Sequence, residues 1–211
     1  ARTALVCLEN TANRGGGSCY HLQEITAIRN LCHQHSLMLH LDGARLFNAL
    51  VATGQQPTDY GRLFHSISIC LSKGLGSPVG SVLIGSKDFI HRARRVRKRM
   101  GGGMRQAGGL AAAGLYALHH HVARLANDHA HAQMLAGALS SLPWVESLLP
   151  VETNIIIFNT KAPRTAAAVV AALKEKGILA YAIAHMQVRL VLHLNISEAD
   201  VHHSIAVFKQ L

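Results

Sequence analysis

Short hydrophobic runs alternate with amphipathic segments through the first half of the chain. Four runs are apolar enough to form buried strands; they span residues 4–8, 37–41, 67–71 and 80–85. Helical spacing of apolar residues marks helices at 22–34 and 44–53, and a further helix-like segment precedes residue 67. This alternation is typical of a mostly parallel sheet, covered by helices on both faces and joined by right-handed crossovers. We therefore predict an α/β fold.

The second half of the chain follows another pattern. Residues 107–142 are rich in alanine and contain no proline, which predicts one or two long helices. A smaller α+β pattern follows, with Ser197 as the expected N-cap of the final helix. Its expected strands are 154–159, 179–183 and 188–194, and its expected helices are 164–176 and 198–211. We predict two domains: residues 1–125, which hold the parallel sheet, and residues 126–211, a small C-terminal α+β domain.

Composition limits the class of protein. The 211 residues are 49% hydrophobic and 15% charged, which is enough for a buried core, and no run reaches the length of a membrane span. The start of the chain, Ala1-Arg2-Thr3, has neither a signal-peptide pattern nor an initiator Met, so we expect a fragment of a longer chain. Four cysteines without metal-ligand spacing predict buried free thiols in a reducing compartment, cytoplasmic or mitochondrial: Cys7, Cys19, Cys32 and Cys70.

The net charge of +10 is concentrated in one segment. Residues 91–100 contain six Lys or Arg and no acidic residue. Nucleic-acid binding would use such a run for phosphate contacts, but the run contains no aromatic residue for base stacking. Apolar residues recur at helical spacing in this segment, which favours an amphipathic helix with a solvated basic face. We expect neither nucleic acid nor a membrane as a partner.

The chemistry of the chain centres on a lysine and an aspartate. Asp42 follows one predicted strand, and Lys73 follows another within Ser72-Lys73-Gly74-Leu75-Gly76. Ligands of open α/β sheets bind at the carboxyl ends of the strands, so both residues, with Glu9-Asn10, are expected at one cleft. An amine that forms imines and a carboxylate that keeps a ring nitrogen protonated are what a pyridoxal-phosphate enzyme requires.

Each of these residues also has a structural interpretation. A lysine before glycine is ordinary in surface turns, and the phosphate-loop motif is not met here. Asp42 is also suited to cap the helix that starts near Ala44, and Arg45 to pair with Asp42. Arg189 lies in a half-buried strand, where it would bind either a substrate carboxylate or an internal acidic residue.

Two further segments are less informative. Gly101-Gly102-Gly103 lies between Lys98 and Arg105, where exposed backbone amides could help to hold a phosphate or form a hinge. His119-His120-His121, with His129 and His131, would point in different directions on a helix. We expect these histidines to be solvated and expect no metal site.

Taken together, the motifs resemble those of the low-specificity L-threonine aldolases, pyridoxal-phosphate enzymes with the aspartate-aminotransferase-like fold. The resemblance runs in order through nearly the whole chain, and SKGLGxPVGS and GGGMRQ are specific to this group. The matching stretches are LENT (8–11), HLDGARLFNA (40–49), ICLSKGLGSPVGSVLIGS (69–86), RKRMGGGMRQAGGLAAAGLYAL (97–118) and VRLVLHL (188–194).

The resemblance implies a role for each site residue. Lys73, next to Ser72, would hold pyridoxal 5'-phosphate as a Schiff base, and Asp42 would bind the pyridine nitrogen. Arg45 would lie against the cofactor and substrate, and Arg189 would bind the substrate carboxylate. Lys98 and Arg105 would lie near the cofactor phosphate, lent by a neighbouring subunit of a homo-oligomer, a dimer or tetramer.

The resemblance also implies an activity, the cleavage of L-threonine or L-allo-threonine to glycine and acetaldehyde. Ala12 replaces a histidine of the family motif, and Asn195 replaces an aspartate. The family carries a phosphate loop and a stacking histidine upstream, so the chain would be the carboxyl-terminal portion of a subunit. Three alternatives stay open: another lyase of the same fold that β-eliminates aromatic amino acids, an inactive truncated remnant, or a basic binding protein.

Overall fold

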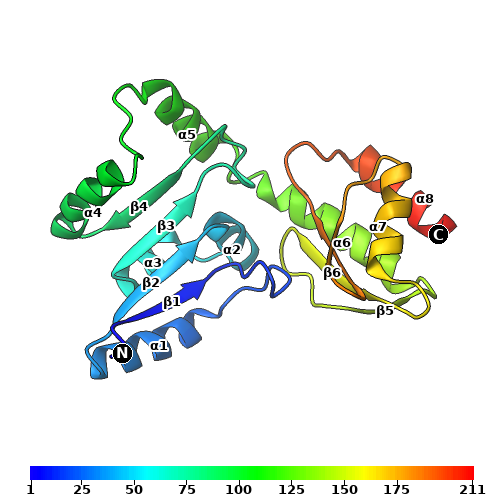
Figure 1. Cartoon of the computed structure of the whole chain (residues 1–211), viewed down its shortest axis with the longest axis horizontal. Helices are drawn as coiled ribbons and strands as arrows, with labels where there is room; N and C mark the ends of the chain where they lie inside the picture. The colour runs from blue at the N-terminus through cyan, green and yellow to red at the C-terminus, as the bar shows by residue number, and fades with distance from the viewer. The chain divides into compact units, whose positions relative to one another are not determined.

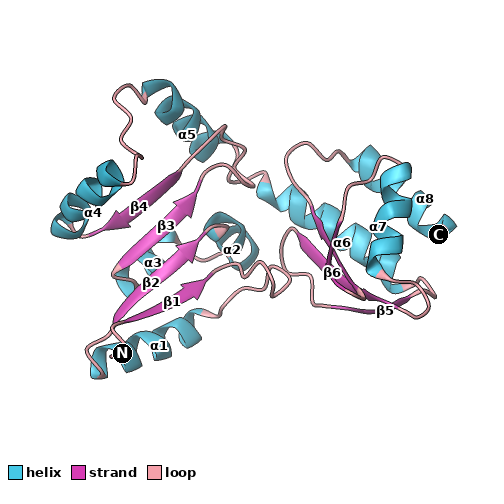
Figure 2. Ribbon diagram, in the orientation of Figure 1, coloured by secondary structure: helices cyan, strands magenta, loops and turns pink.

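The computed structural model describes all 211 residues and divides them into two compact units (Figures 1 and 2). Unit 1 comprises residues 1–11 and 19–123, and unit 2 comprises residues 12–18 and 124–211. The sequence predicted two consecutive segments that meet at 125. In the structure the change of unit follows Ala123, and the loop 12–18 packs with unit 2.

Unit 1 is built on a four-stranded sheet in the order β1-β2-β3-β4 (Figure 1). β1 (Leu5–Glu9), β2 (Met38–Gly43) and β3 (Ser66–Cys70) run parallel to one another, and β4 (Ser81–Gly85) runs antiparallel to β3. These strands fall within a residue or two of the predicted runs. The α/β class with a mostly parallel sheet is therefore confirmed.

Three helices form the core of unit 1 with one face of this sheet. They are α1 (Leu22–Gln34), α2 (Leu46–Thr53) and α3 (Pro57–Leu63). Leu39 and Leu41 of β2 belong to this core and are fully buried. Because side chains alternate along a strand, Met38, His40 and Asp42 point to the opposite face, here called the open face.

The prediction that helices cover both faces of the sheet is wrong for this chain. Leu5 and Met38, which pair in register on the open face, are 48% and 49% exposed. The remaining helices of unit 1 are α4 (Lys87–Arg99) and α5 (Gly108–His120). Of the strands in this sheet, α4 packs against β4, which is the outermost strand (Figure 1). The open face over β1 and β2 is consequently left uncovered.

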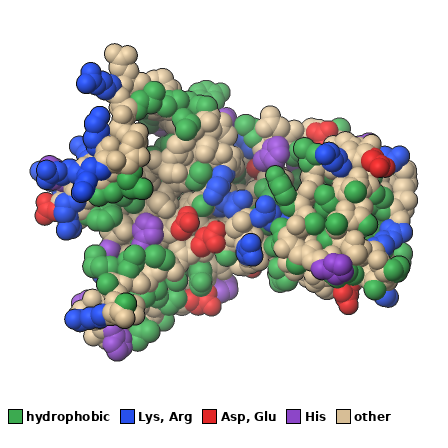
Figure 3. Space-filling view, viewed as in Figure 1, with side chains coloured by type: hydrophobic (Ala, Val, Ile, Leu, Met, Phe, Trp, Pro, Cys, Tyr) green, Lys and Arg blue, Asp and Glu red, His purple; other side chains and the backbone are tan.

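The basic helix is present, but its apolar side is not buried. The side chain of Ser86 caps α4 by accepting a hydrogen bond from the amide of Phe89 at 3.3 Å. No residue of α4 is buried, and Val96 is half exposed. Lys and Arg side chains gather over this helix (Figure 3).

Unit 2 contains an antiparallel sheet in the order β5-β6-β8-β7. Its strands are β5 (Val145–Leu148), β6 (Ile155–Thr160), β7 (Tyr181–Ala184) and β8 (Gln187–Val191). Strand β5 was not predicted from the sequence, because its four residues alternate too briefly to produce a strand pattern.

Three helices complete unit 2: α6 (Leu125–Ser140), α7 (Ala166–Glu175) and α8 (Glu198–Gln210). Ser197 caps α8 as predicted, since its hydroxyl accepts a hydrogen bond from the Asp200 amide at 3.2 Å. Trp144, Phe158 and Phe208 pack against one another with ring centroids 6.0 to 6.4 Å apart. This aromatic cluster lies in the core of unit 2.

The cysteine prediction holds only in part. All four thiols are free, but Cys32 alone is buried, whereas Cys7 is exposed. Cys7 pairs in register with His40, so it lies on the open face, where no helix covers it.

No helix in the structure combines the length and hydropathy that a bilayer-spanning segment requires.

Candidate functional site

The carboxyl ends of β1 and β2 place two acidic residues side by side. Glu9 pairs in register with Asp42, and the amide of Asn10 donates to the Asp42 carbonyl at 3.0 Å. Both carboxylates belong to the open face, because they share the strand parity of His40. The predicted meeting of Glu9 and Asp42 at one sheet edge is therefore confirmed.

Asp42 does not cap a helix in the usual way. Its Oδ1 accepts a hydrogen bond from the Ala44 amide at 3.0 Å, which closes a short turn after β2. The N-cap position of α2 is Arg45, three residues after Asp42. The Asp42 side chain is exposed and Arg45 is half-buried. The carboxylate therefore holds the turn with one oxygen and can present the other to a ligand.

Lys73 lies on a tight turn beyond β3. The Gly76 amide donates to the Lys73 carbonyl at 2.9 Å, and the Ser77 amide donates to the Leu71 carbonyl at 3.0 Å. Ser72 and Lys73 are both exposed. Because β2 and β3 are parallel, this turn lies at the same edge of the sheet as Asp42. The topology thus brings the two predicted catalytic residues to one edge.

Helix α5 supports this turn. Nδ1 of His121 lies 2.6 Å from the carbonyl oxygen of Leu75, to which it donates. The Ser77 hydroxyl reaches the carbonyl of Ala113 at 3.5 Å. The prediction that the histidine run is solvated is wrong for His121, because the fold brings the end of α5 against the turn. A histidine at a solvated helix end and a histidine that supports a neighbouring turn give the same sequence pattern.

A buried amide lies behind the same edge. Asn10 is fully buried, and its Nδ2 donates to the hydroxyl of Tyr60 at 2.9 Å. The Tyr60 hydroxyl donates in turn to Oε1 of Gln55 at 2.7 Å. Burial, more than the nearby Cys19, raises the pKa of Tyr60 to about 12. Tyr60 carried no sequence signal as a site residue, because its partners are 50 and 5 positions away.

Lys98 and Arg105 make no contact with the candidate catalytic residues of their own chain through a hydrogen bond or an ion pair. The antiparallel β4 carries the chain back across the sheet, since Ser66 at the start of β3 pairs with Gly85 at the end of β4. Helix α4 therefore begins at the edge opposite Lys73 (Figure 1). No hydrogen bond or ion pair connects Lys98 or Arg105 with Lys73 or Asp42.

Arg189 belongs to unit 2 and has no acidic partner. Its Nη1 donates to Oδ1 of Asn13 at 3.0 Å, and its guanidinium carbon lies 5.5 Å from the ring centroid of Tyr181. The ion pairs Arg124–Asp128 and His202–Glu198 do not involve Arg189, so the internal salt bridge considered for Arg189 is absent. The guanidinium charge is balanced by no carboxylate of this chain.

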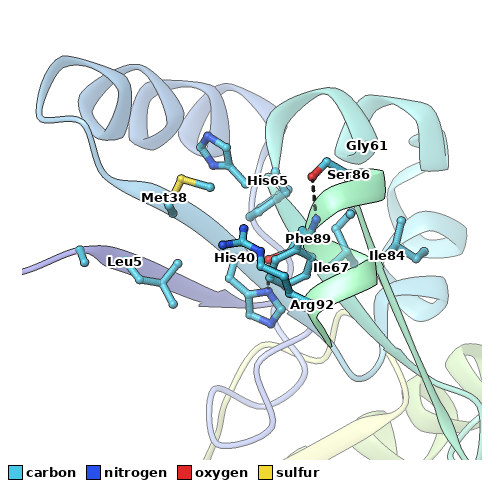
Figure 4. Close-up of a pocket in the computed structure, with 14 residues that line it drawn as sticks. Leu5, Met38, His40, Gly61, His65, Ile67, Ile84, Ser86, Phe89 and Arg92 are labelled. Carbon is cyan, nitrogen blue, oxygen red and sulfur yellow. Dashed lines mark hydrogen bonds between the residues drawn. The ribbon is translucent and has the colours of Figure 1, made fainter. Parts of the chain in front are cut away.

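A large groove lies elsewhere on unit 1. A groove of about 900 Å³ opens on unit 1 between the amino ends of the parallel strands and the start of α4 (Figure 4). Leu5, Met38, Ile84 and Phe89 give it an apolar lining. It includes neither Lys73 nor Asp42, so its size does not mark the site that the chemistry favours.

Lys73 and Asp42 are chemically suited to one kind of cofactor. A lysine amine attaches an aldehyde covalently, and a carboxylate binds a protonated ring nitrogen. Both groups are exposed at the same sheet edge, and the hydrogen bond from the Ala44 amide occupies only one oxygen of Asp42. No group of histidine, cysteine and acidic residues is arranged to hold a metal ion.

Comparison with known proteins matches the sequence of this chain to a family. The beta-eliminating lyase family matches residues 1–163. Low-specificity L-threonine aldolase 1 of Arabidopsis thaliana is 40% identical, over 99% of this chain and 59% of its own length. The low specificity L-threonine aldolase of Escherichia coli K12 is 43% identical, over 95% of this chain and 58% of its own length. The chain thus spans about three fifths of these relatives.

A solved structure agrees on the fold. The threonine aldolase of Leishmania major superposes with a TM-score of 0.81 over 98% of this chain and 60% of its own, at 24% identity. At that identity the likeness establishes the fold alone. The family match covers all of unit 1, including the edge that carries Asp42 and Lys73. Because the family model matches residues 1–163, the chain belongs to the beta-eliminating lyase family.

Proposed function

We propose that this chain acts as a threonine aldolase that depends on pyridoxal 5'-phosphate, cleaving L-threonine or L-allo-threonine to glycine and acetaldehyde. The observation that carries the proposal is the placement of Lys73 and Asp42 at one sheet edge, within a chain 40% to 43% identical to two named aldolases. When bound, the cofactor would accept electron density from the α-carbon of the amino acid.

The residues of unit 1 have separate tasks in this proposal. Nζ of Lys73 attaches the cofactor, and Ser72 borders it. Asp42 keeps a proton on the pyridine nitrogen, while its other oxygen holds the turn to Ala44 at 3.0 Å. Arg45, which follows that turn, would contact the cofactor and the substrate. Because the Asp42 turn is already hydrogen-bonded, Asp42 would need little reorganisation to bind the ring nitrogen.

The remaining cations would bind anionic groups. Arg189 binds the carboxylate of the amino acid, a task for which a guanidinium without an acidic partner is suited. Lys98 and Arg105 would bind the cofactor phosphate from a neighbouring copy in a homo-oligomer. Their separation from Lys73 along the fold supports this assignment, since α4 begins at the opposite sheet edge.

The name of the matched family supports a second candidate, β-elimination from an aromatic amino acid. Product analysis separates the two reactions. We would supply the purified chain with pyridoxal 5'-phosphate and assay glycine and acetaldehyde from L-threonine and L-allo-threonine. In parallel, pyruvate and ammonia would be assayed from L-tyrosine and L-tryptophan.

The aldolase proposal predicts glycine and acetaldehyde in equal amounts, with both lost in Lys73→Ala. Pyruvate and ammonia alone would support the elimination reaction instead. No product from any substrate, with Lys73 free of cofactor, would contradict the proposal for this chain and favour an inactive remnant.

A further inference from the structure

Arg189 is held from two sides within unit 2. It lies on β8, where it pairs in register with Ile157 of β6 and with Tyr181 of β7. Asn13 accepts a hydrogen bond from Nη1, and the Tyr181 ring lies against the guanidinium. These two contacts fix both the in-plane orientation of the group and one of its faces.

The guanidinium is nevertheless incompletely satisfied. Nε of Arg189 is buried and makes no hydrogen bond. Asn13 is a neutral partner, so the positive charge stays uncompensated in a half-buried position. An unsatisfied buried donor and an unbalanced charge are both unfavourable, and a carboxylate would relieve both. Nε and Nη2 form the guanidinium edge that Asn13 leaves open, and such an edge binds carboxylates through two parallel hydrogen bonds.

The loop that carries Asn13 is itself anchored to unit 2. The Gly17 amide donates to the Ala12 carbonyl at 2.9 Å, which closes the loop around Asn13. The Thr153 hydroxyl donates to the Gly17 carbonyl at 2.8 Å. Gly17 has a φ of +78°, and a Cβ there would collide with the Thr153 hydroxyl oxygen and lie 3.2 Å from the Ile155 Cβ. Glycine is therefore required for the loop to lie against the strand next to Arg189.

We propose that Asn13 is a positioning residue for Arg189 and that, with Tyr181, it aims the open guanidinium edge at a substrate carboxylate. The proposal rests on the carboxylate-binding role given to Arg189 under the proposed function. It adds that this role depends on a neutral amide from the loop 12–18. A neutral partner orients the guanidinium without consuming its charge, which an aspartate at the same position would do.

The test follows the Arg189 side chain directly by ¹⁵N NMR of its Nε–H group, assigned by its disappearance in Arg189→Lys. Propionate serves as the carboxylate probe, added to the purified chain without cofactor. We expect a saturable shift of the Arg189 signal in the unsubstituted chain. In Asn13→Ala the signal should broaden through faster hydrogen exchange, and propionate binding should weaken about tenfold, as expected from the loss of one orienting hydrogen bond to a charged group.

A second variant separates orientation from charge. Asn13→Asp should keep the Arg189 signal sharp, because the guanidinium retains an acceptor, yet it should weaken propionate binding by about tenfold or more since an internal carboxylate neutralises the charge. Gly17→Ala should resemble Asn13→Ala. Gly137→Ala is the matched control in unit 2, since its added Cβ meets nothing within 4 Å.

Two results would overturn the inference: equal propionate affinity in the unsubstituted chain and in Asn13→Ala, or no saturable shift of Arg189 at all. Failure of the proposed function is a different result. A chain that binds propionate through this pair but releases no glycine from threonine would contradict the aldolase proposal, while the role of Asn13 would stand.

Discussion

The imidazole of His121 ties the end of α5 to the carbonyl of Leu75, with Nδ1 and oxygen 2.6 Å apart. Leu75 lies two residues after Lys73, within the turn that the Gly76 amide closes by donating to the Lys73 carbonyl. A helix distant in sequence therefore fixes the backbone from which the candidate catalytic lysine projects.

Removal of this contact should loosen the lysine turn. His121→Ala deletes one hydrogen bond, worth about 1 kcal/mol, so amide hydrogen exchange at Gly76 and Ser77 should accelerate roughly fivefold. Turnover should fall as well, because Lys73 loses part of its fixed orientation. His119→Ala is the control, since His119 is exposed and makes no hydrogen bond to the turn. Equal exchange rates in both variants would show that α5 does not hold the turn.

Lys73 should be the residue that binds the cofactor covalently. Borohydride reduction in the presence of pyridoxal 5'-phosphate, followed by peptide mapping, should place the pyridoxyl group on Lys73. Lys73→Ala should lose both the visible absorbance band and turnover, whereas Lys87→Ala, an exposed lysine of the same unit, should keep both. A pyridoxyl group found on another lysine, with Lys73 unmodified, would refute the assignment.

Asp42 should affect turnover far more than substrate binding. Asp42→Asn keeps the acceptor that binds the Ala44 amide at 3.0 Å. It removes the negative charge that keeps the ring nitrogen protonated. Because this charge stabilises the carbanion-like transition state, kcat should fall on the order of 100-fold with a small change in KM. The steady-state rate with threonine measures both constants. An equal loss in Asp42→Asn and in Asp42→Ala, without loss of the fold, would confirm that charge and not the turn is responsible.

Tyr60 should stabilise unit 1 through its hydroxyl. Tyr60→Phe leaves Nδ2 of Asn10 without an acceptor in the interior, and this should cost about 1 to 3 kcal/mol of unfolding free energy. Urea unfolding followed by circular dichroism measures the loss. Tyr181→Phe, at a position 66% exposed, should change the stability little.

The same residue predicts a change of stability at alkaline pH. The pKa of Tyr60 is raised from 10.0 to about 12 in the folded state, so folding favours the protonated phenol. Its contribution is complete below pH 10 and is lost as the pH rises through about 12. Between these values the stability difference between the natural chain and Tyr60→Phe should shrink. A difference that stays constant from pH 8 to 11.5 would contradict this account.

Local sequence was sufficient for most elements. Apolar runs located β1 to β4, and periodic apolar positions located α1 with its observed bounds, 22–34. The placement of Asp42 and Lys73 at one edge also followed from sequence. Parallel strands that are joined by crossover connections have their carboxyl ends at the same edge of the sheet. Those inferences depend on patterns that neighbouring residues share.

Long-range partners could not be obtained in this way. Sequence located Arg189 on a half-buried strand but left its partner open between a substrate and an acidic residue; the fold supplied Asn13, 176 positions away. His121 had the composition of a solvated helix end, and only the tertiary structure placed it against Leu75. Local periodicity and residue type were thus sufficient for most of the strands and helices and for the chemical character of the site. The side chains that support the site were identified only in the folded chain, because such contacts depend on how distant segments pack.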